Sequence, residues 1–283
     1  MSRSTLLAPV ALLVVAMVSI QSGASLAKQL FPVLGAEGTT TLRLVLSAII
    51  LSLVMQPWRA KLDLRKCRAL IAYGLALGCM NLLFYMSLQH IALGIAVALE
   101  FTGPLTLALL SSRRPLDFLW VILAITGLWM LLPTDATQNA IDPLGAALAL
   151  GAGACWSLYI IFGQKAGAEH GRHTVALGTW VAVLLVLPIG IWHTGSNLLN
   201  IDLLPIALAV AVLSSALPYS LEMIALTRLP ARTFSILMSL EPAVAALCGL
   251  IFLGERLLWG QWLAVGAIII ASVGAAATIK PKS

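Results

Sequence analysis

TVALGTWVAVLLVLPIGIW, residues 174–192, is a run of nineteen residues without a charged side chain. A helix of about 18 or more predominantly apolar residues is long enough to cross the hydrocarbon core of a bilayer. This stretch therefore predicts a transmembrane helix, and the same pattern recurs along the chain. Ten such runs are found, at approximately 7–27, 38–56, 69–88, 93–111, 116–133, 143–163, 174–192, 203–226, 232–253 and 257–279.

The overall composition agrees with an integral membrane protein. Of the 283 residues, 60% are hydrophobic and only 10% are charged, whereas soluble domains carry about 25% charged residues. The formal net charge of +6 does not indicate nucleic-acid binding, because the basic residues lie in loops, where they orient membrane helices. We predict an all-α integral membrane protein in contact with the lipid bilayer, without a separate soluble domain and without a nucleic-acid partner.

The basic residues gather in every second gap between the ten runs. Fourteen of the seventeen Lys and Arg residues fall on the side that includes the N-terminus, and the other three are Lys28, Arg256 and Arg43. Loops on the cytoplasmic side carry an excess of Lys and Arg, so we predict that both termini are cytoplasmic. The fourteen residues are Arg3, Arg59, Lys61, Arg65, Lys66, Arg68, Arg113, Arg114, Lys165, Arg172, Arg228, Arg232, Lys280 and Lys282.

The second half of the chain weakly repeats the first. The Gly-Ala-Glu sequence at 35–37 recurs at 167–169. Each half holds five predicted spans, and an odd number places the second half upside down in the membrane. We therefore predict two domains, residues 1–135 and 136–283, as two inverted five-helix repeats, an architecture in which transporters place a site between the repeats. The alternatives are a duplicated structural membrane protein and a cleaved signal peptide in place of the first span.

Three glutamates lie well inside predicted spans: Glu100, Glu222 and Glu241. At 1.5 Å per residue, Glu100 is about 12 Å from the outer end of its span and Glu241 is about 13 Å from the inner end of its own. An ionisable group at that depth costs roughly 3 kcal/mol unless it is paired or hydrated, and it usually faces the bundle interior or a cavity. Each glutamate is therefore a candidate proton carrier, and the alternative is a neutral acid that hydrogen-bonds a neighbouring helix.

Prolines near these acids free backbone carbonyls. A proline cannot donate a hydrogen bond to the carbonyl four residues back, so Pro104 frees the carbonyl of Glu100 and Pro218 frees that of Ser214. Pro242 corresponds to Pro104 in the repeat. Freed carbonyls at membrane depth are tolerated where protein, water or a ligand satisfies them. The alternative is that these prolines only kink their helices.

Arg43 is the one guanidinium well inside a predicted span, away from its ends. It could bind a carboxylate through two parallel hydrogen bonds, or it could pair with Glu100 or another acid for structural reasons. On the first span, Gln21, Ser25 and Lys28 share one face, at spacings of four and three residues. Lys28 at the outer end of that face is best explained by snorkelling.

Further polar and aromatic side chains share faces of single helices. Asn81 and Tyr85 are four residues apart, Trp156 and Tyr159 are three apart, and Tyr219 is close to one turn before Glu222. Aromatic rings with one polar tip suit the wall of a cavity for a small polar solute, and the alternative is packing. The predicted substrate-binding or proton-coupling residues are Glu100, Glu222, Glu241, Arg43, Asn81, Tyr85, Trp156, Tyr159 and Tyr219.

Cofactor, metal and enzyme chemistry are not indicated. The four cysteines have no ligand-like spacing, and neither an HExxH motif nor a cofactor-binding glycine loop is present. An intramembrane transferase or protease would need a nucleophile–base pair or paired aspartates deep within the spans, but no aspartate and no histidine lies deep there, since Asp117 is the second residue of its run. We predict no cofactor, no metal and no enzymatic activity.

Several motifs resemble those of the drug/metabolite transporter superfamily with two EamA-type halves. They include Ser22-Gly-Ala-Ser-Leu-Ala-Lys28, Leu93-Gly-Ile-Ala-Val-Ala-Leu-Glu-Phe-Thr-Gly-Pro-Leu105 and Ala216-Leu-Pro-Tyr-Ser-Leu-Glu-Met-Ile-Ala-Leu-Thr-Arg-Leu-Pro230. The resemblance covers essentially the whole chain, except segments 134–140 and 194–202, and is greatest to the threonine and homoserine exporters of bacterial inner membranes. It implies proton-driven efflux of small amino acids from a cavity between the halves.

With this resemblance, we expect alternating access. Arg43 would attract the α-carboxylate, and one of the three glutamates would meet the ammonium group or release a proton in exchange. Asn81 and the tyrosines would bond the side-chain hydroxyl. The alternative within the same fold is export of a nucleoside, a sugar, a drug or another amino acid. The oligomeric state does not follow from the sequence.

Overall fold

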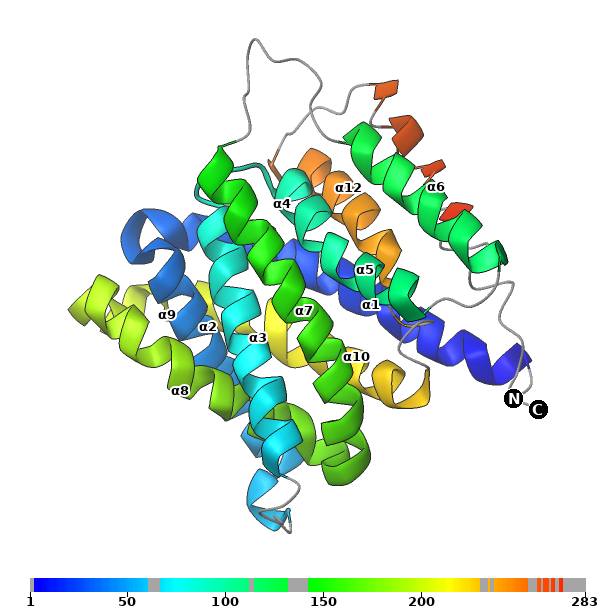
Figure 1. Ribbon diagram of the computed structural model, residues 1–283. Helices are drawn as coiled ribbons and strands as arrows, with labels where there is room; N and C mark the ends of the chain where they lie inside the picture. Colours follow the sequence, from blue (N-terminus) through cyan, green and yellow to red (C-terminus); the bar gives the residue numbers. More distant parts are fainter. Residues whose placement is uncertain are drawn as a thin grey trace.

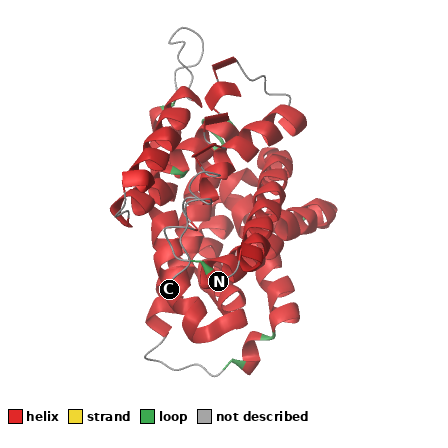
Figure 2. Cartoon of the chain, turned by 90° about the vertical axis from the view of Figure 1, so that its right-hand side faces the viewer, coloured by secondary structure: helices red, strands yellow, loops and turns green. Residues whose placement is uncertain are grey.

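The structure is a computed structural model that describes residues 3–60, 67–111, 115–131, 142–229, 234, 237–253, 259–260, 262–264, 266–267 and 270–271. Every regular element in these residues is helical (Figure 2). The basic loop segments at 61–66 and 112–114 lie outside the described residues. So do the proposed domain junction at 135/136 and most of the predicted span 257–279.

The described helices follow the predicted spans closely. They are α1 (Arg3–Ala27), α2 (Phe31–Met55), α3 (Cys67–Ser87), α4 (Leu93–Glu100), α5 (Thr102–Ser111), α6 (Pro115–Leu131), α7 (Pro143–His170), α8 (Thr174–Thr194), α9 (Leu204–Ala211), α10 (Leu217–Arg228) and α12 (Glu241–Leu253). Short 3₁₀ turns lie at Lys28–Leu30, Pro57–Arg59, Gly171–His173, Gly195–Leu199, Ile201–Leu203 and Met238–Leu240.

Five continuous helical segments are long and apolar enough to cross a membrane, judged by length and composition: Pro9–Met55, Cys67–Ser87, Pro143–His170, Thr174–Leu199 and Ile201–Arg228. The first contains α1 and α2 with the 3₁₀ turn Lys28–Leu30 between them. Within α2 the backbone is kinked at Gly35, with φ 66° and ψ −178°, a conformation that favours glycine. The prediction of an all-helical membrane protein is confirmed. The arrangement of ten spans in two inverted repeats stays a prediction.

Two spans that the sequence predicts as continuous are interrupted. The predicted helix 93–111 is divided at Phe101 into α4 and α5, because Pro104 offers no N–H to continue the ladder to Glu100. The predicted helix 203–226 changes to π-helical geometry at Val212–Ala216, between α9 and α10. There the N–H of Leu217 bonds to the carbonyl of Val212, and Pro218 follows directly. Single-turn π stretches are frequent at functional sites.

The distribution of side chains is inverted relative to a soluble protein. Leu53, Leu184 and Trp192 are 69%, 71% and 86% exposed, whereas Arg43 and Glu222 are only 2% and 3% exposed. Large apolar groups on the outside and charged groups on the inside are the arrangement that a lipid environment requires.

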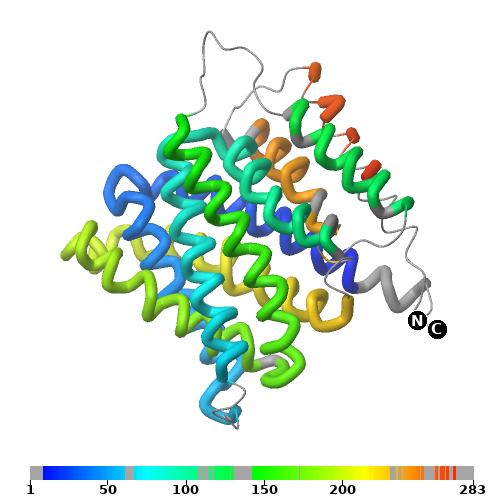
Figure 3. Tube along the Cα trace, in the orientation of Figure 1, coloured from blue at the N-terminus to red at the C-terminus, as the bar shows by residue number. Residues whose placement is uncertain are grey.

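Helix packing brings the two halves of the chain together. α3 packs against both α7 and α8, and α2 packs along α8; in Figure 1, α2 is blue, α3 cyan, α7 green and α8 yellow-green. α1 crosses behind them and packs against α10 and α12, and α7 also contacts α4 and α5. The tube in Figure 3 shows α6 at one edge of the bundle, beside the described pieces of 259–271.

Glycines allow the closest helix approaches. A Cβ atom at Gly153 of α7 would overlap the backbone carbonyl oxygen of Glu100, and one at Gly103 of α5 would overlap that of Gly153. A Cβ atom at Gly23 of α1 would lie 2.7 Å from the backbone nitrogen of Ser214 in the π stretch. In membranes, small residues permit such contacts between backbones.

A capping contact joins the two halves near one end of the bundle. Asp142 accepts the backbone N–H of Leu144 at 2.9 Å, at the N-terminus of α7, and contacts Nδ1 of His90 at 2.7 Å. The backbone N–H of Leu144 and the side chain of His90 hold the pKa of Asp142 below its ordinary value. His90 lies between α3 and α4, so this pair connects the start of α7 to the α3–α4 turn.

Substitution of Gly153 tests the close approach of α7 to α4. The Gly153→Ala variant should lose about 1–3 kcal/mol of stability through overpacking, and its thermal unfolding midpoint in detergent should fall by several degrees. Gly151→Ala is the matched control, because its Cβ would meet only the flexible end of Leu83 at 3.3 Å. Equal midpoints for the two variants would contradict the packing described here.

Candidate functional site

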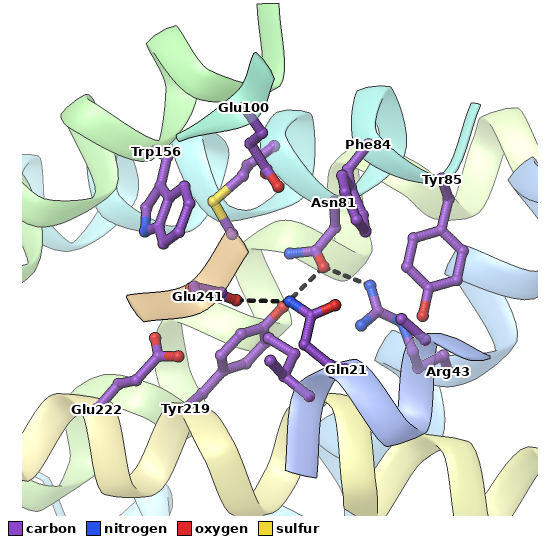
Figure 4. Close-up of a pocket in the computed structure, with 13 residues that line it drawn as sticks. Gln21, Arg43, Asn81, Phe84, Tyr85, Glu100, Trp156, Tyr219, Glu222 and Glu241 are labelled. Carbon is purple, nitrogen blue, oxygen red and sulfur yellow. Dashed lines mark hydrogen bonds between the residues drawn. The ribbon is translucent and has the colours of Figure 1, made fainter. Parts of the chain in front are cut away.

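A cavity lies inside the bundle, between residues of α1, α2, α3, α4, α7, α10 and α12 (Figure 4). Ligand sites in proteins are concave and carry few, well-placed polar groups on mostly apolar walls. The lining residues are Ile20, Gln21, Ala24, Arg43, Met80, Asn81, Phe84, Tyr85, Glu100, Trp156, Tyr219, Glu222 and Glu241.

The structure brings the predicted site residues together. Eight of the nine line the cavity: Glu100, Glu222, Glu241, Arg43, Asn81, Tyr85, Trp156 and Tyr219. The ninth, Tyr159, lies behind the wall and donates a hydrogen bond to Oε2 of Glu222 at 3.0 Å. All nine are buried. Their transport roles stay predictions.

Arg43 is held by backbone and amide oxygens. Its Nη1 donates to the carbonyl oxygen of Ser214 at 3.1 Å and to the Ser214 hydroxyl at 3.2 Å, and its Nη2 donates to Oδ1 of Asn81. The guanidinium also lies over the ring of Tyr85, 4.3 Å from its centroid. No ion pair joins it to Glu100 or to any other carboxylate of the described residues, and its Nε is buried without a hydrogen-bond partner there.

The partner of Arg43 is the carbonyl that the sequence predicts to be free. Pro218 has no N–H, so the carbonyl of Ser214 cannot complete its helical hydrogen bond and accepts from Arg43 instead. The preceding carbonyl, of Leu213, accepts from the hydroxyl of Ser19 at 2.6 Å. Side chains of α1 and α2 thus satisfy the irregular backbone between α9 and α10, as membrane burial requires.

Asn81 connects Arg43 to Tyr219. Its Oδ1 accepts from Arg43 and from the Tyr219 hydroxyl, the latter at 2.7 Å, and its Nδ2 donates to the carbonyl of Leu77 at 2.7 Å. An amide oxygen has two lone pairs, so both acceptor positions of Asn81 are used by the protein. In this structure Asn81 positions its neighbours and presents no free acceptor to a solute.

Two of the three acids have neutral partners. Gln21 donates from Nε2 to Oε1 of Glu241 at 3.0 Å, and Glu222 accepts from Tyr159. Oε1 of Gln21, Oε2 of Glu241 and the hydroxyl of Tyr85 are buried without partners among the described residues. These free polar atoms border the cavity, where a polar solute would satisfy them.

The cavity is electrically polarised. In Figure 4, Glu100, Glu222 and Glu241 gather around Trp156 at one end, while Arg43 and Tyr85 occupy the other, with Gln21, Asn81 and Tyr219 between them. A cationic group is favoured beside the carboxyls and an anionic group beside the guanidinium. No group of three or more metal-ligating side chains is found in the part of the chain that the structure describes.

Sequence reasoning missed several lining residues. Gln21 carries a signal, since it is a polar residue within an apolar span and shares a face with Ser25 and Lys28. Ile20, Met80 and Phe84 carry none, because apolar side chains in a membrane helix look alike whether they face lipid or a cavity.

Comparisons with known proteins show which family and which solved fold this chain is similar to. The EamA-like transporter family matches residues 143–276. The chain is 58% identical, over 275 residues, to the threonine/homoserine exporter RhtA of Escherichia coli (strain K12), covering 97% of this chain and 93% of that protein. It is 59% identical, over 272 residues, to the exporter of the same name from Salmonella typhimurium (strain LT2), covering 96% and 92%. A solved crystal structure with 16% sequence identity has the same fold, with a TM-score of 0.69 over 98% of this chain and 97% of the other.

Substitution of Arg43 tests how much its hydrogen bond to the freed Ser214 carbonyl stabilises the protein. Arg43→Lys keeps the positive charge but loses the paired donors to Ser214 and Asn81, and a buried acceptor left unsatisfied costs about 1–3 kcal/mol. Pro218→Ala restores an N–H that can reach the Ser214 carbonyl. The double variant should therefore be less destabilised than the sum of the single variants, as measured by thermal unfolding in detergent. Strict additivity would show that Arg43 and Pro218 are not coupled.

Proposed function

We propose, since this chain belongs to the EamA-like transporter family, that it exports small amino acids, chiefly L-threonine and L-homoserine, across the bacterial inner membrane. The observation that carries this proposal is the 58% identity, over 97% of the chain, to an exporter named for these two solutes. The cavity described above supports it independently, because its charges are arranged as a zwitterion requires.

The α-carboxylate of the solute would bind Arg43. This guanidinium has no carboxylate partner among the described residues and keeps its buried Nε free. A buried charge without a counter-ion is costly, so an incoming carboxylate would stabilise it. The contact of Arg43 with the Tyr85 ring fixes the plane of the guanidinium and supports a defined orientation of the bound carboxylate.

The ammonium group would bind at the acidic end, beside Oε2 of Glu241, which has no partner in the described residues. The side-chain hydroxyl of threonine or homoserine would then lie near the middle of the cavity, where Oε1 of Gln21 and the hydroxyl of Tyr85 are free. This proposal transfers hydroxyl recognition from Asn81 to Gln21, because the Oδ1 of Asn81 is already used twice.

The charge of the cavity supports proton coupling. Three carboxyls and one guanidinium line it, and a zwitterionic solute adds no net charge. Three ionised carboxylates in one buried chamber would repel one another strongly. Proton uptake by at least one of them relieves that repulsion, and its release can be exchanged for solute. We therefore propose a proton-coupled antiporter.

The packing supports two inverted repeats that rock against each other. α1 contacts α10 and α12 of the second half, and α7, its counterpart, contacts α3 and α4 of the first half. In the same way, α2 packs on the π stretch before α10, while its counterpart α8 packs on α3. This reciprocal pattern supports the domains 1–135 and 136–283 with a site between them, and alternating access by motion of one repeat against the other.

Proteoliposomes containing the purified protein provide the test. Wild-type protein should exchange threonine for protons, whereas Glu100→Gln and Glu222→Gln should each lower the rate at least tenfold, because a neutral amide cannot carry the proton. Asp202→Asn is the matched control, since Asp202 is exposed near the start of α9, outside the cavity. Wild-type rates in both glutamate variants would contradict the assignment.

The choice of solute has its own test. Overexpression in a bacterial host should raise resistance to threonine and homoserine analogues and leave sensitivity to nucleosides, sugars and dyes unchanged. The reverse profile would identify a different solute for the same fold.

A further inference from the structure

Three tyrosines from different helices form a file beside the cavity. Tyr73 of α3, Tyr159 of α7 and Tyr219 of α10 are each at most 1% exposed. The ring centroids of Tyr73 and Tyr159 are 5.1 Å apart, and those of Tyr159 and Tyr219 are 6.4 Å apart. Only Tyr219 lines the cavity, so the file begins at the chamber wall and leads away from it.

Glu222 stands where this file meets the cavity. Its carboxyl lines the chamber, and its Oε2 accepts the hydroxyl of Tyr159 from outside the chamber at 3.0 Å. One carboxyl is thus accessible to the solute and also bonded to a hydroxyl that the solute does not reach.

Tyr73 continues the file, in a space that two glycines provide. A Cβ atom at Gly163 of α7 would lie 3.3 Å from the ring of Tyr73, and one at Gly178 of α8 would overlap it. The Tyr73 hydroxyl lies close to Tyr159, but no hydrogen bond of ordinary length and angle joins it to any residue that the structure describes. A fully buried hydroxyl without a partner is unfavourable, and packing alone would be served equally well by phenylalanine.

The file runs toward one end of the bundle. A Cβ atom at Gly163 would meet both Tyr73 and Leu226, and Leu226 is one helical turn beyond Glu222 on α10. Tyr73 therefore lies about one turn closer than Glu222 to the end where α3 begins and α7 and α10 terminate. From Tyr73 to Cys67, the first residue of α3, is about 9 Å at 1.5 Å per residue. The charge pattern of the sequence predicts that this end is cytoplasmic.

We propose that Tyr159 and Tyr73 conduct protons between Glu222 and the cytoplasm, along a route separate from the solute cavity. The inference rests on the proposed proton-coupled export. The protonated Glu222 carboxyl gives its proton to the Tyr159 oxygen, Tyr159 passes its own hydroxyl proton to the Tyr73 oxygen directly or through one water, and Tyr73 passes its proton to cytoplasmic water. Both tyrosines end neutral and Glu222 ends as a carboxylate, the state in which Tyr159 donates to it.

The Tyr73→Phe variant tests this route, because it keeps the ring between Gly163 and Gly178 and removes only the hydroxyl. In proteoliposomes, net threonine transport coupled to proton movement, recorded with an internal pH dye, should fall at least fivefold. Threonine–threonine exchange at equal pH needs no net proton transfer and should stay within twofold of wild type. Thr179→Val is the matched control, since it removes another buried hydroxyl beside Gly178, one that bonds only within its own helix, and it should leave both rates unchanged.

The outcomes separate the route from the proposed function. Unchanged coupled transport in Tyr73→Phe, with coupling intact in wild type, overturns the route alone. Equal losses of coupled transport and of exchange also overturn it, since the hydroxyl would then act on the solute step or on folding, which the thermal unfolding midpoint distinguishes. A wild-type protein that moves threonine without protons, or that does not move threonine, overturns the proposed coupling and the route with it.

Discussion

A carbonyl oxygen buried in a membrane needs a hydrogen-bond donor, and the centre of this protein is organised around carbonyls that prolines have freed. Pro218 leaves the Ser214 carbonyl unbonded, and Arg43 donates to it. Once Arg43 is fixed there, Asn81 and Tyr219 complete its surroundings. The cation that can attract a carboxylate is therefore held by a defect in the backbone of another helix. Loss of that defect would release Arg43 from its position.

Pro104 and Pro242 also free backbone carbonyls, and each of these carbonyls is accommodated in a different way. The Glu100 carbonyl, freed by Pro104, faces Gly153 so closely that a Cβ atom there would overlap its oxygen, so this approach requires glycine. The Met238 carbonyl, freed by Pro242, accepts the N–H of Glu241 in a 3₁₀ turn. The backbone carbonyl in the first case belongs to Glu100, and the backbone N–H in the second belongs to Glu241, so both lie at a glutamate of the site. The chain thus places its acids where the helical ladder is already interrupted.

The sequence predicts the depth of the charged residues but not their partners. Long apolar runs, interrupted by single acids, show that Glu100, Glu222 and Glu241 cannot face lipid, and the structure buries all three. Which helices meet is a different question. Gln21 reaches Glu241 across 220 positions of sequence and Tyr159 reaches Glu222 across 63, and no local period encodes such contacts. The interruptions at Phe101 and Val212–Ala216 have a visible cause in Pro104 and Pro218, yet their geometry depends on Gly153 and Ser19, which belong to other helices.

The neutral partners of the acids bear on how such a cavity can exchange protons. A cation beside Glu222 would hold it as a carboxylate, and an apolar wall would hold it as an acid. Tyr159 does neither, because a phenolic hydroxyl donates to a carboxylate and accepts from a carboxylic acid with only a rotation of its proton. Gln21 achieves the same for Glu241 when its amide turns, since its oxygen is free. Arg43, by contrast, has donors only and stays charged throughout. Under the proposed function, this arrangement would assign carboxylate binding to the fixed charge and proton exchange to the acids with amphoteric partners, so that gain and loss of the proton itself would need no rearrangement of the surrounding helices.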